Sequence, residues 1–125
     1  MNIRNLALAV LLAASFQSIA QERMARVGYL NWKDSGPYYE VTNRGFVKGL
    51  GEEGFVEGKN LTILRRSVDF NPDLFQPQAR EMSRAGVDVF FASATTMATA
   101  AWRASGTTPI VIATILDPVE LEFVK

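Results

Sequence analysis

The sequence contains no cysteine and no histidine among its 125 residues. The absence of cysteine excludes disulfide bonds, thiol nucleophiles and a lipid anchor attached to a cysteine side chain. The absence of histidine removes the commonest general base near neutral pH, and without either residue type we expect no zinc site. A reaction would have to use carboxylates, lysine, tyrosine or hydroxyl groups. We therefore expect a binding protein without a cofactor rather than an enzyme.

The sequence also has no excess of positive or negative charge, because Lys+Arg and Asp+Glu each number 13. Arg4 is the one charged residue among the first twenty, which leaves 12 basic and 13 acidic side chains in the rest of the chain. A nearly neutral surface does not attract the phosphate backbone of a nucleic acid or an anionic bilayer. We therefore expect no nucleic-acid partner.

The amino terminus has the three-part pattern of a secretory signal peptide. A short positive segment precedes the apolar residues 6–14, and the small residues Ser18 and Ala20 occupy positions −3 and −1 of a cleavage site. A membrane-spanning helix would need about 20 apolar residues, more than this run offers. We predict removal of residues 1–20 and export of residues 21–125 as one domain. In a Gram-negative source this domain is periplasmic and carries no lipid anchor.

The rest of the chain alternates apolar runs with amphipathic segments. Four runs rich in β-branched and aliphatic residues predict buried strands. These runs cover residues 26–30, 60–68, 87–93 and 109–116. Segments of helical periodicity lie between them. They cover residues 39–53, 74–86 and 95–106. The alternation predicts an α/β fold with an open parallel sheet covered on both faces, and right-handed crossovers favour the Rossmann-like strand order 2-1-3-4.

Residues 49–54 (GLGEEG) match the letters of a dinucleotide-binding G-x-G-x-x-G motif. That site needs its glycines between the end of a strand and the start of a helix. Here the glycines close a predicted helix, and the carboxylates of Glu52 and Glu53 would repel a pyrophosphate. We therefore interpret the motif as a helix end.

Candidate binding residues follow the strands, since ligands bind at the carboxyl ends of strands in open parallel sheets. They are Asn31, Trp32, Ser93, Thr95, Thr96, Thr114 and Asp117. Hydroxyl and free N–H groups at a helix start can bind a carboxylate, Asp117 can accept hydrogen bonds from an ammonium group, and Trp32 can pack on an apolar or cationic group. This set suits an amino acid or another small polar solute. The same spacing equally fits Thr95 or Thr96 as a simple helix cap and Trp32 as cover for a loop.

Four blocks of sequence, taken together, resemble one protein family. They are RVGYL, GFVKGLGEEGFVEGKNLTI, VDVFFASATTMATAAWRAS and TPIVIATILDPV, in this order between Arg26 and Val119. They resemble the substrate-binding proteins of ABC transporters, of the tryptophan/tyrosine type. The resemblance implies the type I periplasmic-binding-protein fold, in which two α/β lobes close on a small solute, and an ABC permease as partner. It also implies that the cleft is lined by Ser93, Thr95, Thr96 and Asp117, with Asn31 and Trp32 beside them.

The chain departs from the family pattern after Val119, where Glu120-Leu121-Glu122-Phe123 replaces the usual small residues. Relatives continue through a second lobe, so the resemblance implies that residues 21–125 are the amino-terminal lobe alone, from a fragment or a truncated gene. Two other functions stay open. One is a small enzyme of the flavodoxin-like type, and the other is a truncated interaction protein that no longer binds solute.

Overall fold

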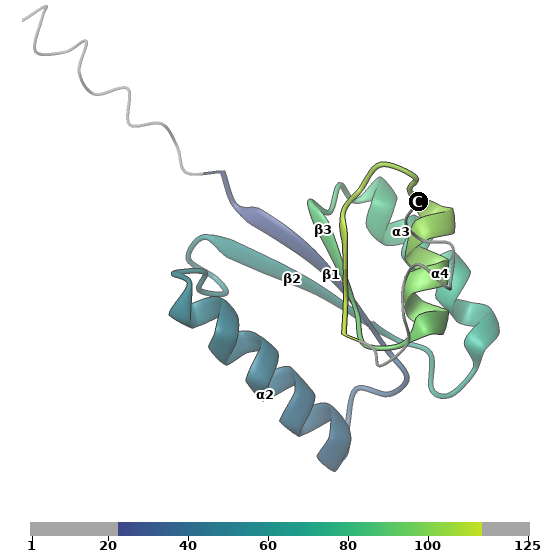
Figure 1. Cartoon of the computed structure of the whole chain (residues 1–125), viewed down its shortest axis with the longest axis horizontal. Helices are drawn as coiled ribbons and strands as arrows, with labels where there is room; N and C mark the ends of the chain where they lie inside the picture. Colours follow the sequence, from purple (N-terminus) through teal and green to yellow (C-terminus); the bar gives the residue numbers. More distant parts are fainter. Residues whose placement is uncertain (1–22, 114–125) are drawn as a thin grey trace, which may run out of the picture.

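The computed structural model of the chain describes residues 23–113. The predicted signal peptide, Thr114 and Asp117 lie outside the described residues. The elements, in chain order, are β1 (Ala25–Asn31), α2 (Pro37–Glu52), β2 (Leu61–Ser67), the 3-10 turn η1 (Pro72–Leu74), α3 (Phe75–Arg84), β3 (Val89–Ala92), α4 (Thr95–Ala104) and β4 (Ile110–Ile112). The four strands are parallel in the order β2-β1-β3-β4 (Figure 1). The α/β class, the open parallel sheet and the strand order are therefore confirmed.

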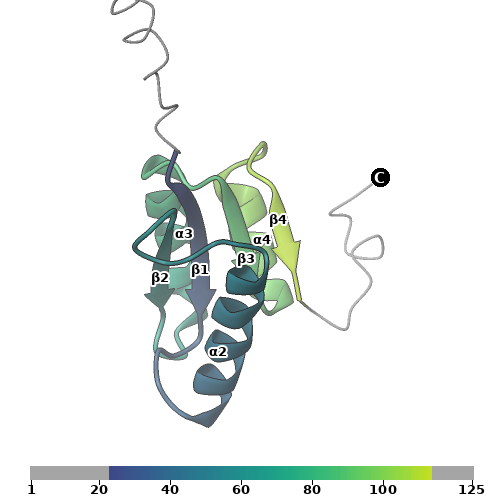
Figure 2. The same ribbon diagram turned by 90° about the vertical axis from the view of Figure 1, so that its left-hand side faces the viewer.

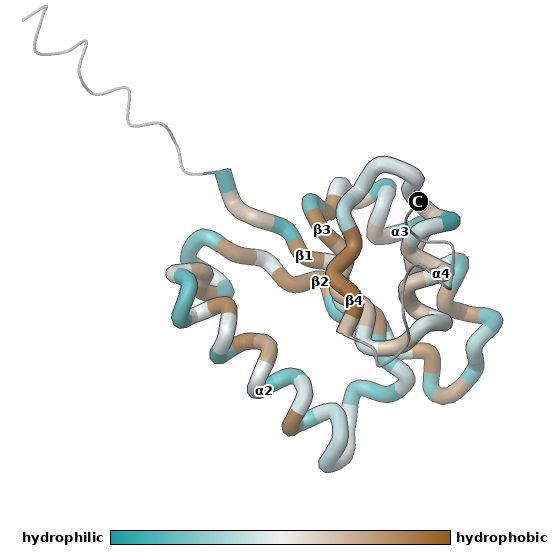
Figure 3. The backbone as a smooth tube through the Cα atoms, in the orientation of Figure 1, coloured by the Kyte–Doolittle hydropathy of each residue, from teal (hydrophilic) through white to brown (hydrophobic). Residues whose placement is uncertain are grey.

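The helices form a layer on each face of the sheet, with α2 on one side and α3 and α4 on the other (Figure 2). Alternate residues of β1 serve the two faces. Val27 and Tyr29 are buried with Phe46 of α2, whereas Leu30 is buried with residues of α3 and α4. The hydrophobic residues gather in the strands (Figure 3). Burial on both faces explains the continuous apolar run of β1.

Helix α2 begins at Pro37, two residues before the predicted start, because proline is well suited to the first helical position. It ends at Glu52, and Gly54 follows with a φ of 86°. The interpretation of residues 49–54 as a helix end is thus confirmed. Val41 of α2 is 68% exposed although it is apolar.

Neither of the other two helices, α3 and α4, begins with a side-chain cap. The Asn71 side chain caps η1, where it accepts a hydrogen bond from the Asp73 backbone N–H at 3.2 Å, whereas Leu74 holds the cap position of α3 and Pro77 lies in the first turn of that helix. The prediction that Thr95 or Thr96 caps the following helix is wrong. Ala94 holds the cap position with extended backbone, no side chain caps the helix, and Thr95 is already its first residue.

Candidate functional site

Three polar side chains stand side by side at the carboxyl edge of the sheet. Asn31, the last residue of β1, is in register with Ser67 of β2. Tyr29 is in register with Phe91 of β3, so that Ser93, two residues further, comes beside Asn31. Because side chains alternate between the faces of a strand, Asn31 and Ser67 lie on the face that α2 covers, whereas Ser93 lies just beyond β3 and its hydroxyl donates to the Met97 sulfur at 3.5 Å. We call Ser67, Asn31 and Ser93 the polar row.

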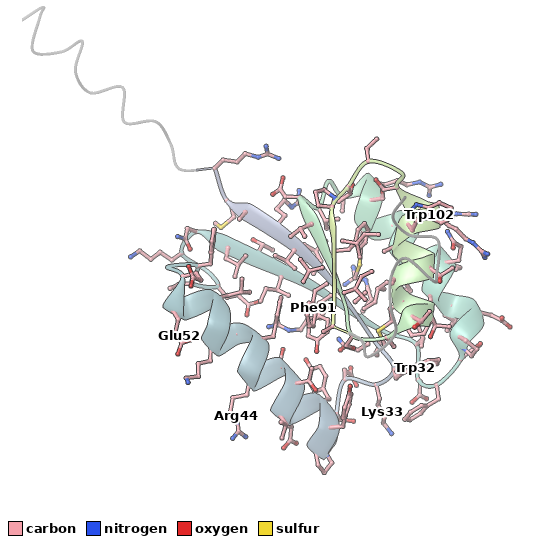
Figure 4. The ribbon with its side chains drawn as sticks, in the orientation of Figure 1. Trp32, Lys33, Arg44, Glu52, Phe91 and Trp102 are labelled. Carbon is pink, nitrogen blue, oxygen red and sulfur yellow. The ribbon has the colours of Figure 1, made fainter. Side chains whose placement is uncertain are left out.

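A cavity of about 230 Å³ opens at the Ser93 end of the polar row. It is lined by Tyr29, Asn31, Trp32, Lys33, Ser35, Tyr38, Tyr39, Phe70, Ser93 and Met97. Half of these residues are aromatic, and we call the space the aromatic cavity. Its walls come from β1, the loop after β1, the first turn of α2, the loop after β2, the loop after β3 and α4. Trp32 and Lys33 lie at this end of the sheet (Figure 4).

The aromatic side chains of this cavity support one another. Trp32 packs its edge against Phe75, with 4.7 Å between ring centroids, and stacks with Phe70 at 6.5 Å and 18°. The ammonium group of Lys33 lies 6.0 Å from the centroid of the Phe70 ring. Burial, and to a lesser degree the neighbouring Tyr39 and Tyr38, raises the pKa of Tyr29 to about 12. Its phenol therefore stays neutral near neutral pH.

Asn31 is the most informative residue of the site. Asn31 is only 5% exposed, and its side-chain amide nitrogen makes no hydrogen bond with any described residue. A buried donor without an acceptor costs about 1–3 kcal/mol, so native proteins seldom keep one without a reason. A ligand that brings an acceptor would recover this cost.

A second cavity, of about 490 Å³, lies at the other end of the polar row. We call it the polar cavity. It is lined by Asn31, Asp34, Tyr39, Arg65, Arg66 and Ser67. The Arg65 guanidinium donates to both carboxylate oxygens of Glu57, at 2.7 and 3.0 Å, and to the side-chain oxygen of Asn43 at 3.1 Å. Hydrogen bonding by Arg65 lowers the pKa of Glu57, which keeps this pair charged.

The structure divides the residues expected at the strand ends into two groups. Asn31, Trp32 and Ser93 line the aromatic cavity. Thr95 and Thr96 instead line a separate cavity of about 420 Å³ between η1, α3 and α4. Whether any of the five contacts a ligand stays a prediction.

Sequence reasoning missed several residues of the site, notably Lys33, Tyr38, Tyr39 and Phe70. Pro37 could have indicated the two tyrosines, because it begins α2 and places them in the first turn, just beyond β1. No sequence signal marked Phe70. It reaches the cavity because Asp69 and Phe70 both adopt positive φ, of 45° and 62°.

Within residues 23–113, no helix is long and apolar enough to cross a membrane. The same part of the chain has no group of acidic side chains placed to hold a metal ion.

Comparison with known proteins identifies the family. The family model described as ABC transporter substrate binding protein matches residues 35–125. The chain belongs to this family. A tyrosine-binding protein of Clostridioides difficile (strain R20291) is 29% identical to it over 89 residues, which are 71% of this chain and 26% of the relative. Family membership bears out the resemblance found in the sequence.

Three solved structures share the fold of this chain. A conserved domain protein from Vibrio cholerae gives a TM-score of 0.73 at 31% identity, covering 82% of this chain and 34% of that one. The ligand-free, open structure of a substrate-binding protein with adhesive properties from Clostridium difficile gives 0.72 at 31% identity, covering 81% and 34%. An ABC domain from Streptococcus pneumonia in complex with L-Trp gives 0.70 at 24% identity, covering 80% and 33%, and shows the shared fold alone. The chain thus spans about a quarter to a third of the length of these four proteins.

Proposed function

We propose that the protein binds an amino acid with an aromatic side chain, as the solute-binding component of an ABC importer. The observation that carries this proposal is the unpaired, buried amide of Asn31 between an aromatic and a polar cavity. Aromatic walls suit a planar ring, and a few fixed polar groups orient a small ligand. The relative described as a tyrosine-binding protein supports the same class of solute. A family of substrate-binding proteins favours binding over the enzymatic alternative.

In this proposal residues 21–125 supply the amino-terminal wall of a cleft between two lobes. The greater length of the relatives supports a second lobe as the opposite wall. Solute that contacts both walls stabilises the closed form, which a permease can distinguish from the open one. Binding to the single wall described here is then expected to be weak.

The proposal also includes the periplasm as the location and an inner-membrane permease as the partner. Substrate-binding proteins of ABC transporters work outside the cytoplasm, and the signal-peptide pattern of residues 1–20 supports the same location.

The experiment is a titration of the isotope-labelled protein with L-tyrosine and L-tryptophan, followed by amide chemical shifts, which detect weak binding. We expect shifts among residues of the aromatic cavity and the polar row. Asn31→Ala should weaken binding about tenfold, because the ligand loses a buried hydrogen-bond partner.

Thr62→Ala is the matched control, since Thr62 is exposed near the amino end of β2 and lines neither the aromatic nor the polar cavity. It should leave binding unchanged. Shifts that gather around Thr62, or none with either amino acid, would contradict the proposal.

A further inference from the structure

The polar cavity offers a second set of contacts that the aromatic cavity lacks. We propose that it holds the charged head group of the amino acid, with the carboxylate against Arg66, Ser67 and Asn31 and the ammonium group against Asp34. The aromatic side chain of the solute then fills the neighbouring aromatic cavity. This inference rests on the proposed function and adds to it the orientation of the solute.

The two cavities are adjacent, because Asn31 and Tyr39 line both of them. One small molecule can therefore occupy both at once. The separate cavity beside α4 shares no lining residue with either.

The charges of the polar cavity suit a zwitterion. Arg65 is already neutralised by Glu57, with which it forms the ion pair of this cavity. Neither Arg66 nor Asp34 takes part in an ion pair among the described residues. The Arg66 guanidinium donates one hydrogen bond to the Arg65 carbonyl oxygen at 2.9 Å, which leaves its other N–H groups for a ligand.

The polar cavity also contains the donor groups that a carboxylate needs. A guanidinium binds a carboxylate through charge-assisted hydrogen bonds, commonly two at once. The hydroxyl of Ser67 and the amide of Asn31 are neighbours in the strand register. The Asn31 nitrogen has no acceptor among residues 23–113, and rotation about the last side-chain bond can turn it toward a bound oxygen. A carboxylate would thus satisfy a buried donor that the fold leaves unpaired.

The test compares four binding measurements, in which one charge is removed from the protein, from the solute, from both or from neither. The wild type and Arg66→Gln are each titrated with L-tryptophan and with L-tryptophanamide, which keeps the ring and the ammonium group but lacks the carboxylate charge. We expect the wild type to bind the amide about tenfold more weakly than the acid. Arg66→Gln should lose about the same factor for L-tryptophan and bind the two compounds almost equally.

Arg103→Gln is the control, because Arg103 is an exposed arginine of the separate cavity beside α4. Loss of discrimination in Arg103→Gln rather than in Arg66→Gln would overturn the inference, and so would equal binding of both compounds by the wild type. In either case binding of L-tryptophan itself would leave the proposed function standing. Failure of every version to bind either compound would instead contradict the proposed function.

Discussion

The turn that presents Phe70 to the aromatic cavity holds two consecutive non-glycine residues in left-handed conformation. Such a conformation costs about 1–2 kcal/mol for an ordinary residue. Two backbone hydrogen bonds hold the turn, from Phe70 N–H to the Trp32 carbonyl at 3.1 Å and from Asn71 N–H to the Val68 carbonyl at 2.8 Å. The result is a phenylalanine that stacks with Trp32 while 66% exposed. Strain of this kind gathers at ligand sites, where a contact offsets it.

Replacing Asp69 with glycine should therefore raise the free energy of unfolding by about 1 kcal/mol, because glycine adopts positive φ without a steric cost. Urea denaturation measures the change. Asp73→Gly is the control, since Asp73 is exposed and lies in η1. It should lower stability by about 0.5–1 kcal/mol through the entropy of glycine. Equal destabilisation by both substitutions would show that the Asp69 backbone is not strained.

Residues of the site were predictable where they follow a strand directly. Asn31, Trp32 and Ser93 were found because parallel strands end at a common edge, and the register then places Asn31 and Ser93 side by side. Phe70 was not predictable, since its position depends on two φ angles that phenylalanine and aspartate rarely adopt.

At the scale of elements, a glycine of β1 and a glycine of α2 differ in their surroundings. A Cβ atom on Gly28, in the central strand β1, would lie 3.0 Å from a ring carbon of Phe90 and 3.1 Å from the sulfur of Met82. Both neighbours are fully buried, so neither can move freely. A Cβ atom on Gly45, within α2, would meet nothing within 4 Å.

The same substitution should thus have opposite effects in the two elements. Gly28→Ala should lower the free energy of unfolding by about 1–3 kcal/mol through overpacking of β1 against β3 and α3. Gly45→Ala should raise it by about 0.5–1 kcal/mol, because alanine restricts the unfolded chain and favours a helix. Chemical denaturation of both variants measures the two changes in the free energy of unfolding. A stable Gly28→Ala protein would mean that Phe90 and Met82 yield more easily than their burial implies.

The strands were predictable as elements because burial on both faces leaves each of them as an apolar run. The helix boundaries were less predictable from the sequence. Proline and glycine settled the two ends of α2, whereas the start of α4 has no side-chain cap to mark it. Thr95 and Thr96 resemble caps in sequence, yet the extended backbone of Ala94 places both within the helix.

For the whole molecule, handedness made the strand order predictable, but the unequal covering of the sheet was not foreseen. On the α2 side an apolar groove of about 390 Å³ runs beside the helix, and Val111 of β4 is 56% exposed in it. Phe91 lies between α2 and the sheet, whereas Arg44 and Glu52 point away from it (Figure 4). A single helix is too narrow to cover four strands, a limit that hydrophobic periodicity does not express.

Export of the whole chain is tested at its amino terminus. Mass spectrometry of the protein recovered from the periplasm should find Gln21 as the first residue. Ala20→Leu should leave the precursor uncut, because the processing site needs a small residue at −1. Ala13→Leu, within the apolar run, should be processed normally. Recovery of an uncut wild-type chain from the cytoplasm would contradict the predicted location.

Because of the polar row, solute recognition depends on which residues of β1 face α2. Since neighbouring side chains of a strand point to opposite faces, loss of one residue between Ala25 and Asn31 would exchange Tyr29 and Asn31 for Leu30 on the α2 side. A point substitution in this strand alters the contacts of one side chain. Deletion of a single codon would move the side chains on one side of the deletion to the opposite face of the sheet. Among descendants of this gene, the number of residues in β1 should accordingly be under stricter selection than the identity of most of these residues.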